Sequence, residues 1–412
     1  MASDNRPSNR RLSHVPRPWP KPSMAIPVAS WHLQQCPLAA YSMRHPIAFR
    51  GAGRSHQHRI CRARRVISFA WRKRMDRNAL LSMNCEGRGK AMKISTAMLV
   101  SAFFSILGSD AWAAQFDPVP AWAYPVMEPG RERGPDDGTL HSVEGSKLSL
   151  TQTEIGNGFG PADWFPDEHP PMPGVVAHGT EPRVRACSLC HLPSGSCHPE
   201  SANLAGLSSP YIYQQLKDFK SGARRSGDPD RPGIMVTIAR DMTDAQMREA
   251  ADYFAALPQV KWNEVVEAEM VPKTYVAAGN MRHALPDGGM EPIGSRIIEI
   301  PTDSERAELR DPHSPFVAYV PPGALAKGKE LAATGGDGKT FQCAMCHGPE
   351  LKGTEVVPGI AGRSPIYLAR QMLDMQDGAR NGEYAVMMVG MVPNLSEDDI
   401  VNLAAYVGSL DP

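Results

Sequence analysis

Two short cysteine–histidine motifs constrain this chain more than any other feature. Residues 187–191 read Cys-Ser-Leu-Cys-His, and residues 343–347 read Cys-Ala-Met-Cys-His. The C-x-x-C-H pattern attaches haem covalently, because two thiols bond to vinyl groups on one edge of the porphyrin and the adjacent histidine faces the iron. We therefore expect two haem c groups. The attachment and proximal-ligand residues are Cys187, Cys190 and His191 in the first motif and Cys343, Cys346 and His347 in the second.

The cysteine pairs have two alternative interpretations. A redox dithiol of the thioredoxin kind requires a βαβ context, and the sequence around the motifs does not have one. A structural zinc ion requires four ligands, and the two pairs lie 156 residues apart. Haem attachment therefore remains the expected chemistry of both motifs.

The second motif belongs to a repeat of the first. At an offset of 156 residues, Tyr211 matches Tyr367 and Gln215 matches Gln371, and the tripeptide Gly-Ala-Arg at 222–224 recurs at 378–380. After a three-residue deletion the offset becomes 153, and Met235 then matches Met388. A repeat of this length indicates two copies of one structural unit.

Each copy predicts helices. In the first copy, apolar residues recur at helical spacing between 210 and 221, and Thr243 with Gln246 forms a capping-box pattern ahead of 245–257. In the second copy, residues 323–333 predict a helix leading to the motif, and Ser396 caps a helix over 397–410.

The matched methionines are candidates for the second axial ligand. Methionine sulfur opposite histidine raises a haem potential and suits an electron carrier. Met235 and Met388 occupy equivalent places in the two copies, although Met387 and Met391 are neighbours that could serve in place of Met388. The alternative is that these methionines fill gaps in the core, in a chain that has 21 of them.

The N-terminal region carries an export signal at an unusual place. Met92-Lys93, an apolar run from Ile94 to Leu107 and an A-x-A site ending at Ala113 predict a signal peptide over 92–113. The run is shorter than the ~20 residues that span a bilayer, and a retained anchor is the alternative. Residues 1–91 hold 18 basic and 3 acidic residues. We interpret them as upstream sequence translated in error, with a genuine basic extension as the alternative.

Three other groups of residues lie outside the motifs. Cys197 has no partner cysteine in the exported part of the chain, and it is either a plain free thiol, an intermolecular disulfide or a ligand. Arg224 and Arg380 are candidate partners of haem propionates, with simple solvation as the alternative. Four histidines are alternative axial ligands that we expect at the surface instead: His178, His198, His283 and His313.

On these residues the two copies resemble class I cytochromes c, and the pair resembles the dihaem cytochrome c4 family. The resemblance covers roughly 175–258 and 323–412, including Asn203-Leu204-Ala205-Gly206 and Gly362-Arg363-Ser364-Pro365. It implies a mainly α fold of two tandem cytochrome c-like helical haem modules, joined here by an unusually long, partly extended linker. The expected parts are an extension (1–91), a signal peptide (92–113), an extended arm (114–174), module one (175–258), a linker with one or two short strands (259–322) and module two (323–412).

One departure from the family concerns the first histidine. Cytochromes of this kind carry a proline whose carbonyl orients the proximal histidine; Pro358 fits in module two, but Ala202 stands at the equivalent position in module one. We therefore expect a looser His191.

The predicted function is periplasmic electron transfer, with the chain acting alone or as the cytochrome subunit of an exported dehydrogenase. Outside 1–91 the chain has a net charge of −15, which favours partners with basic docking patches. The expected partners are an exported dehydrogenase as donor and an oxidase or another cytochrome as acceptor. We expect no nucleic-acid partner, and membrane association only if the export segment is retained. The alternative is a dihaem enzyme resembling thiosulfate dehydrogenases or peroxidases.

Overall fold

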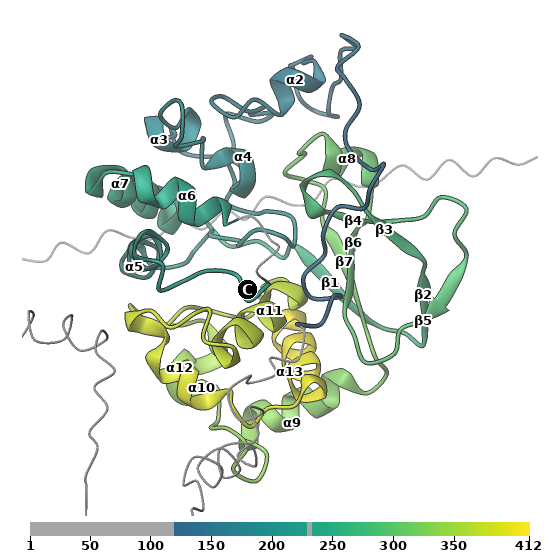
Figure 1. Cartoon of the computed structure of the whole chain (residues 1–412), viewed down its shortest axis with the longest axis vertical. Coiled ribbons are helices and arrows are strands. Elements are labelled where there is room, and N and C mark those ends of the chain that lie inside the picture. The colour runs from purple at the N-terminus through teal and green to yellow at the C-terminus, as the bar shows by residue number, and fades with distance from the viewer. Residues whose placement is uncertain (1–118, 229–232) are drawn as a thin grey trace, which may run out of the picture. The chain divides into compact units, whose positions relative to one another are not determined.

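Two groups of helices and a set of short strands make up the described part of the chain (Figure 1). The computed structural model describes residues 119–228 and 233–412, all within one unit of the chain, Thr96–Pro412. The expected extension (1–91) and signal peptide (92–113) lie outside the described residues. The short helix α2 (Gln152–Ile155) precedes both groups. The helices of the two groups are α3 (Gly174–Ala177), α4 (Ser188–His191), α5 (Ser209–Ser221), α6 (Ile234–Asp241) and α7 (Asp244–Ala256), then α9 (Ala324–Thr334), α10 (Ala344–His347), α11 (Pro365–Gln376), α12 (Val386–Met391) and α13 (Glu397–Ser409).

In the first helical group, α3–α7, helices α5 and α7 form where the sequence predicts them, whereas α3, α4 and α6 were not predicted. Helix α5 begins after Ser208, whose hydroxyl accepts a hydrogen bond from the Tyr211 amide, and ends at Gly222, which has a left-handed φ of 81°. Helix α7 begins with the predicted capping box of Thr243 and Gln246. Helices α5, α6 and α7 pack around a core that includes the fully buried Phe254.

The second helical group, α9–α13, is held by a close helix crossing. Helix α13 begins at the predicted cap Ser396 and packs against α9 and α11. At the crossing of α9 and α13, a Cβ atom on Gly328 would lie only 1.9 Å from the carbonyl oxygen of Asn402. Only glycine allows the two backbones to approach this closely.

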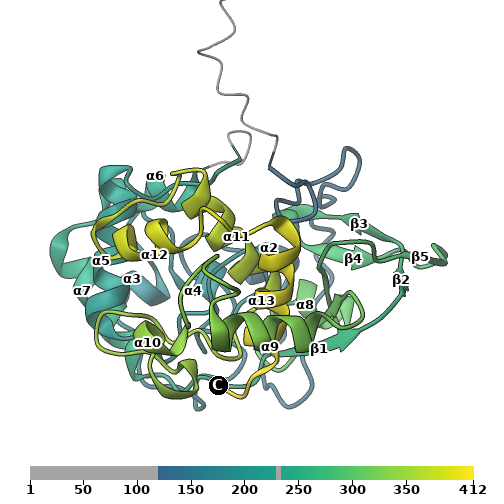
Figure 2. The ribbon, with the colours of Figure 1, turned by 90° about the horizontal axis from the view of Figure 1, so that it is seen from below.

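The β unit, residues 263–320, separates the two groups along the chain. It contains β1 (Asn263–Glu267), β2 (Met270–Pro272), β3 (Thr274–Val276), β4 (Arg282–Ala284), β5 (Met290–Pro292), β6 (Ile298–Pro301), α8 (Ser304–Glu308) and β7 (Phe316–Val320). Strand β7 lies at the centre of a three-stranded sheet, parallel to β1 and antiparallel to β6, while β2–β5 and β3–β4 are two-stranded ribbons. Figure 2 shows these ribbons at the end of the unit away from α5 and α7.

The expectation of a linker with one or two short strands is therefore wrong in extent. Seven strands form within the β unit, and Ile298, Ala318 and Val320 on its sheet are almost fully buried. Strand β1 pairs with β7, about fifty residues later. Runs of three to five residues are too short to show their pairing as periodicity. The β unit packs on α11 and α13 through β6 and β1, so it is a packed element of the fold.

The segment before the first helical group is an extended arm, as expected, but it does not wrap that group alone. The Trp164 indole donates a hydrogen bond of 2.7 Å to the carbonyl of Leu309 in the β unit. The Tyr124 hydroxyl donates a hydrogen bond of 2.8 Å to Asp374 on α11. The arm therefore ties the β unit and the second helical group together.

Candidate functional site

The second motif opens onto an apolar cavity of about 350 Å³. Helix α10 carries the motif, and Cys343, Cys346 and His347 all line the cavity. The other walls come from α11, α12, α13, the loops of the second group and a few residues of the first group such as Leu207 and Tyr211. They are mainly aliphatic and aromatic, and include Tyr367, Leu368, Met372, Leu395 and Ala404. A concave, mostly apolar cavity with a few convergent polar groups is the usual form of a cofactor site.

The ring of His347 is held in one orientation. Its Nδ1 donates a hydrogen bond of 2.9 Å to the carbonyl of Pro358, which leaves Nε2 as the nitrogen able to ligate a metal. Burial lowers the pKa of His347 below its ordinary value, so the imidazole is neutral, as a metal ligand must be.

Methionines of α12 line the same cavity. Met387, Met388 and Met391 all do so, and the structure therefore brings the predicted residue Met388 and its two neighbours to one place. Their exposure differs: Met388 packs against the core of the second group, whereas the Met387 side chain is 63% exposed. The packing favours Met388 among the three.

The first motif repeats this arrangement. Helix α4 carries it, and Nδ1 of His191 donates a hydrogen bond of 2.8 Å to the carbonyl of Ala202. Burial lowers the pKa of His191 to about 4. The expectation of a looser His191 is therefore wrong, because the acceptor is a backbone carbonyl and alanine supplies it as well as the proline at 358 does. Met235 on α6 is half-buried and packs on the same core as Cys187.

None of the four motif cysteines forms a disulfide; Cys187, Cys190 and Cys343 are half-buried and Cys346 is exposed. Burial raises the pKa of Cys187 to about 12 and also raises the pKa values of Cys190 and Cys343. A redox dithiol needs a lowered thiol pKa, so this environment does not fit that alternative. Cys197 is also buried, its Sγ donates to the carbonyl of Ser201, and burial raises its pKa well above the ordinary value. The structure thus gives Cys197 no thiolate character.

Arg224 and Arg380 meet at the boundary between the two helical groups. Arg224 donates to Gln215 of its own group and to Tyr367 and Gln371 of the other. Arg380 reciprocates with bonds to Gln371, to Tyr211 and to Gln215. Both side chains are buried, so the alternative of simple solvation is wrong for both. Of the two, Arg380 also lines the cavity at the second motif.

A further arginine at the cavity, Arg363, was not among the propionate partners expected from the sequence. Arg363 is only 4% exposed, lines the cavity and donates to the backbone oxygen of Asn203 in the first group. Its Nη2 has no partner within the described residues, and burial lowers its pKa to about 10. An unpaired buried cation beside an apolar cavity is what the anionic propionates of a haem require, so the residues present fit the group.

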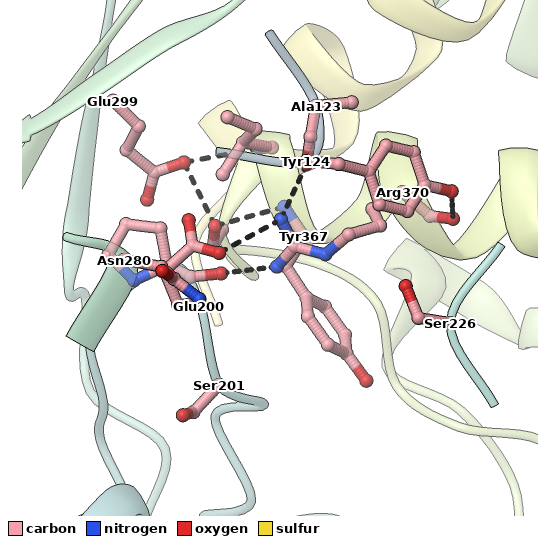
Figure 3. Close-up of polar contacts among 12 residues, drawn as sticks. Ala123, Tyr124, Glu200, Ser201, Ser226, Asn280, Glu299, Tyr367 and Arg370 are labelled. Carbon is pink, nitrogen blue, oxygen red and sulfur yellow. Dashed lines mark hydrogen bonds and ion pairs between the residues drawn. The ribbon is translucent and has the colours of Figure 1, made fainter. Parts of the chain in front are cut away.

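A buried polar junction joins four segments around Arg370 (Figure 3). The guanidinium donates to the carbonyls of Ala123 in the arm and Pro199 in the first group and lies 3.6 Å from the Glu200 carboxylate. Beside it, Glu299 of β6 accepts hydrogen bonds from the Ser364 hydroxyl and the Ile366 amide. Sequence reasoning missed this junction. The repeat contained one indication of this junction. Arg370 places a positive charge at a position where the first copy has the neutral Gln214.

The four alternative histidine ligands have different environments. His178 and His313 are exposed, as expected. The expectation of a surface position is wrong for His283, which is 1% exposed and lies 3.1 Å from the Glu308 carboxylate. It also fails for His198, whose pKa burial lowers to about 3. Neither lines the cavity at the second motif.

Within residues 119–228 and 233–412, no helix combines the length and the apolar character that crossing a membrane requires. No group of three or more histidine, cysteine, aspartate or glutamate side chains there is arranged to hold a metal ion.

Comparison with known proteins gives one consistent family. The profile of the Cytochrome c family matches residues 325–411. Cytochrome c-554(548) of Halomonas halodenitrificans is 36% identical over 78 residues, which are 94% of that protein and 19% of this chain. Cytochrome c4 of Stutzerimonas stutzeri is 25% identical over 240 residues, covering 89% of it and 57% of this chain. A protein of the same species named thiosulfate dehydrogenase electron acceptor is 25% identical over 235 residues, covering 82% of it and 56% of this chain. The chain belongs to the cytochrome c family, and within that family it resembles the dihaem class I cytochromes of the c4 type.

Proposed function

We propose that this protein is a periplasmic dihaem cytochrome that passes electrons between redox proteins. A bound haem supplies an iron that takes up and releases one electron. The chain's own residues attach the haem, orient its ligands and exclude water from it. The observation that best supports this proposal is the cavity at the second motif. Two thiols (Cys343 and Cys346), an oriented imidazole (His347) and a thioether (Met388) surround one apolar space there.

Residue roles follow from that cavity and from the repeat. In the proposal, the cysteines of the two motifs attach two haems, with His191 and Met235 as axial ligands of the first and His347 and Met388 as those of the second. The modules span 175–258 and 323–412. The equal hydrogen bonds of His191 and His347, to carbonyls eleven residues further along the chain, support this pairing. Arg363 and Arg380 are the proposed propionate partners at the second haem.

The electron donor is proposed to be an exported dehydrogenase. Relatives named thiosulfate dehydrogenase electron acceptor, and another named cytochrome subunit of sulfide dehydrogenase, support a dehydrogenase of a reduced sulfur compound as that donor. An oxidase or a second cytochrome is the proposed acceptor. The environment of Cys197 supports the carrier over an enzyme with a cysteine-ligated haem, because its Sγ donates to the Ser201 carbonyl and the residue does not line the cavity at the second motif.

The haem content of the exported protein tests the proposal. The pyridine haemochrome assay should give two haems per chain, and intact mass should rise by two haem masses. The C187A/C190A and C343A/C346A variants should each retain one haem. A wild-type protein with one haem or none, or a double variant that still carries two, would refute the assignment. Turnover of thiosulfate or peroxide by the purified protein would favour the enzyme alternative.

A further inference from the structure

Arg310 of the β unit contacts the backbone of the first motif. Its Nη2 donates a hydrogen bond of 3.2 Å to the carbonyl of Ser188, which lies between the two cysteines of that motif. Ser188 is 1% exposed, so the contact lies in the protein interior. Arg310 belongs to the β unit, which lies outside the repeat and has no second copy. The repeat therefore provides no equivalent of this contact.

The charge of Arg310 is not neutralised by its neighbours. The nearest carboxylates along the chain are engaged elsewhere: Asp311 pairs with Arg306 at 2.6 Å, and Glu308 pairs with Arg133 at 2.6 Å. Within the described ranges no carboxylate lies at ion-pair distance from Arg310, and its buried Nε has no hydrogen-bond partner. The guanidinium is thus a largely buried cation without a counter-charge.

The backbone is distorted at the same residue. Arg310 has a φ of 63°, the left-handed conformation that non-glycine residues rarely adopt. The turn is fixed on both sides, because the Leu309 carbonyl accepts from Trp164 and the Arg310 amide donates to Ala307. Strain that neighbouring contacts maintain is a reason to seek a role for the residue it positions.

The cations near the second motif come from its own helical group, because Arg363 and Arg380 are buried and line its cavity. No residue of the β unit lines that cavity. The motif residues Ala344, Met345 and Cys346 are exposed, whereas Ser188 and Leu189 of the first motif are buried. The contact between the β unit and a haem motif is therefore made at the first motif.

We propose that Arg310 is a potential-setting residue, whose uncompensated charge raises the reduction potential of the first haem. This inference rests on the proposed function, since it requires a haem at the first motif. A nearby cation disfavours the more positive, oxidised iron, and a low-dielectric surrounding strengthens the effect. The β unit would then tune the first haem separately from the second, whose cavity is lined by Arg363 and Arg380.

Spectroelectrochemical titration of the haem-loaded full chain tests the inference. The wild-type titration is fitted with two one-electron components, and M388A identifies the second haem as the component that it displaces. R310Q should lower the midpoint of the first component and leave the second in place. R310K retains the charge and should keep the wild-type value. R296Q is the matched control, because it removes a cation of the same β unit that pairs with Glu291 at 2.7 Å, and it should move neither component.

The outcomes separate this inference from the proposed function. Unchanged midpoints in R310Q, an equal shift of both components, or an R310K shift as large as that of R310Q would overturn the role of the charge. If R310Q fails to fold, R310M serves instead: its long, flexible side chain fills similar space without the charge, and it should lower the first component. An R310M protein with unchanged midpoints would also overturn it. Failure of the proposed function would be visible earlier, as fewer than two haems in the wild-type protein.

Discussion

The guanidinium of Arg380 donates a hydrogen bond of 2.6 Å to the hydroxyl of Tyr211, which lies 169 residues earlier in the chain. In the equivalent pair the first group supplies the arginine: Arg224 donates a hydrogen bond of 2.9 Å to the hydroxyl of Tyr367 in the second group. The two helical groups thus exchange equivalent side chains across their boundary. Both tyrosines also line the cavity at the second motif, so the boundary and the candidate haem site share residues.

Loss of one of these hydroxyls should weaken the boundary. Y211F removes the acceptor of a buried charged donor, and a hydrogen bond of this kind contributes about 1.5–3 kcal/mol. We expect the free energy of unfolding of the haem-loaded protein, measured by denaturant titration, to fall by that amount. The control is Y213F on the same helix, whose hydroxyl contacts Asp244 at the surface and should cost less than about 1 kcal/mol. Equal losses in the two variants would contradict the importance of the boundary.

The helix crossing at Gly328 gives a second stability prediction. G328A places a methyl group 1.9 Å from the Asn402 carbonyl oxygen, and α9 and α13 must then move apart. Overpacking costs typically about 1–3 kcal/mol, and the same denaturant titration should record a loss of this size or larger. G390A is the matched helical control, because nothing lies within 4 Å of the added methyl group; it should be neutral or gain up to ~1 kcal/mol. A G328A protein as stable as wild type would contradict the crossing.

The axial methionines can be separated from their neighbours spectroscopically. A ferric haem with methionine ligation has a weak charge-transfer band at the long-wavelength end of its visible absorption spectrum. We expect M235A and M388A each to remove about half of this band, because each removes one of two equivalent ligands. M387A is the control and should leave the band intact, since that side chain is 63% exposed. If M387A removes the band and M388A does not, the ligand assignment in the second copy is wrong.

Sequence reasoning recovered the local parts of this fold. The helices at Ser209–Ser221, Asp244–Ala256 and Glu397–Ser409 were predictable because their capping residues and apolar spacing lie within each segment. The repeat also marked Arg224 and Arg380 as related residues, although not as partners across a boundary. The repeat also singled out Met388 by aligning it with Met235, and Met388 lines the cavity at the second motif.

The non-local parts were not recoverable in this way. Strand β1 pairs with β7 about fifty residues later, and neither run alone shows which partner it will meet. Glu299 lies between two isoleucines in β6, so its burial depends on Ser364 of another segment. Arg310 has no motif at all, and its contact with Ser188 depends on a turn fixed by Trp164 of the arm. Each of these features needs tertiary packing that a local pattern does not encode.

The buried carboxyl of Glu299 predicts a pH dependence of stability. Burial raises its pKa to about 7, although the hydrogen bonds from Ile366 and Ser364 act in the opposite direction. An unfolded glutamate titrates near 4.5, so the folded state holds the proton over a range in which the unfolded state releases it. The stabilisation from this group is complete below pH ~4.5 and is lost as pH rises to about 7, by an amount on the order of 3 kcal/mol.

Denaturant titrations of haem-loaded protein between pH 4.5 and 8 measure this dependence. E299Q carries no titratable proton and keeps an acceptor for Ser364, so its unfolding free energy should fall less steeply across this interval than that of wild type. The matched control is E264Q, an exposed residue of the same sheet, which should follow the wild-type curve. Parallel curves for E299Q and wild type would mean that Glu299 is ionised throughout in the folded protein, with its three neighbours Ser364, Ile366 and Arg370 compensating the charge.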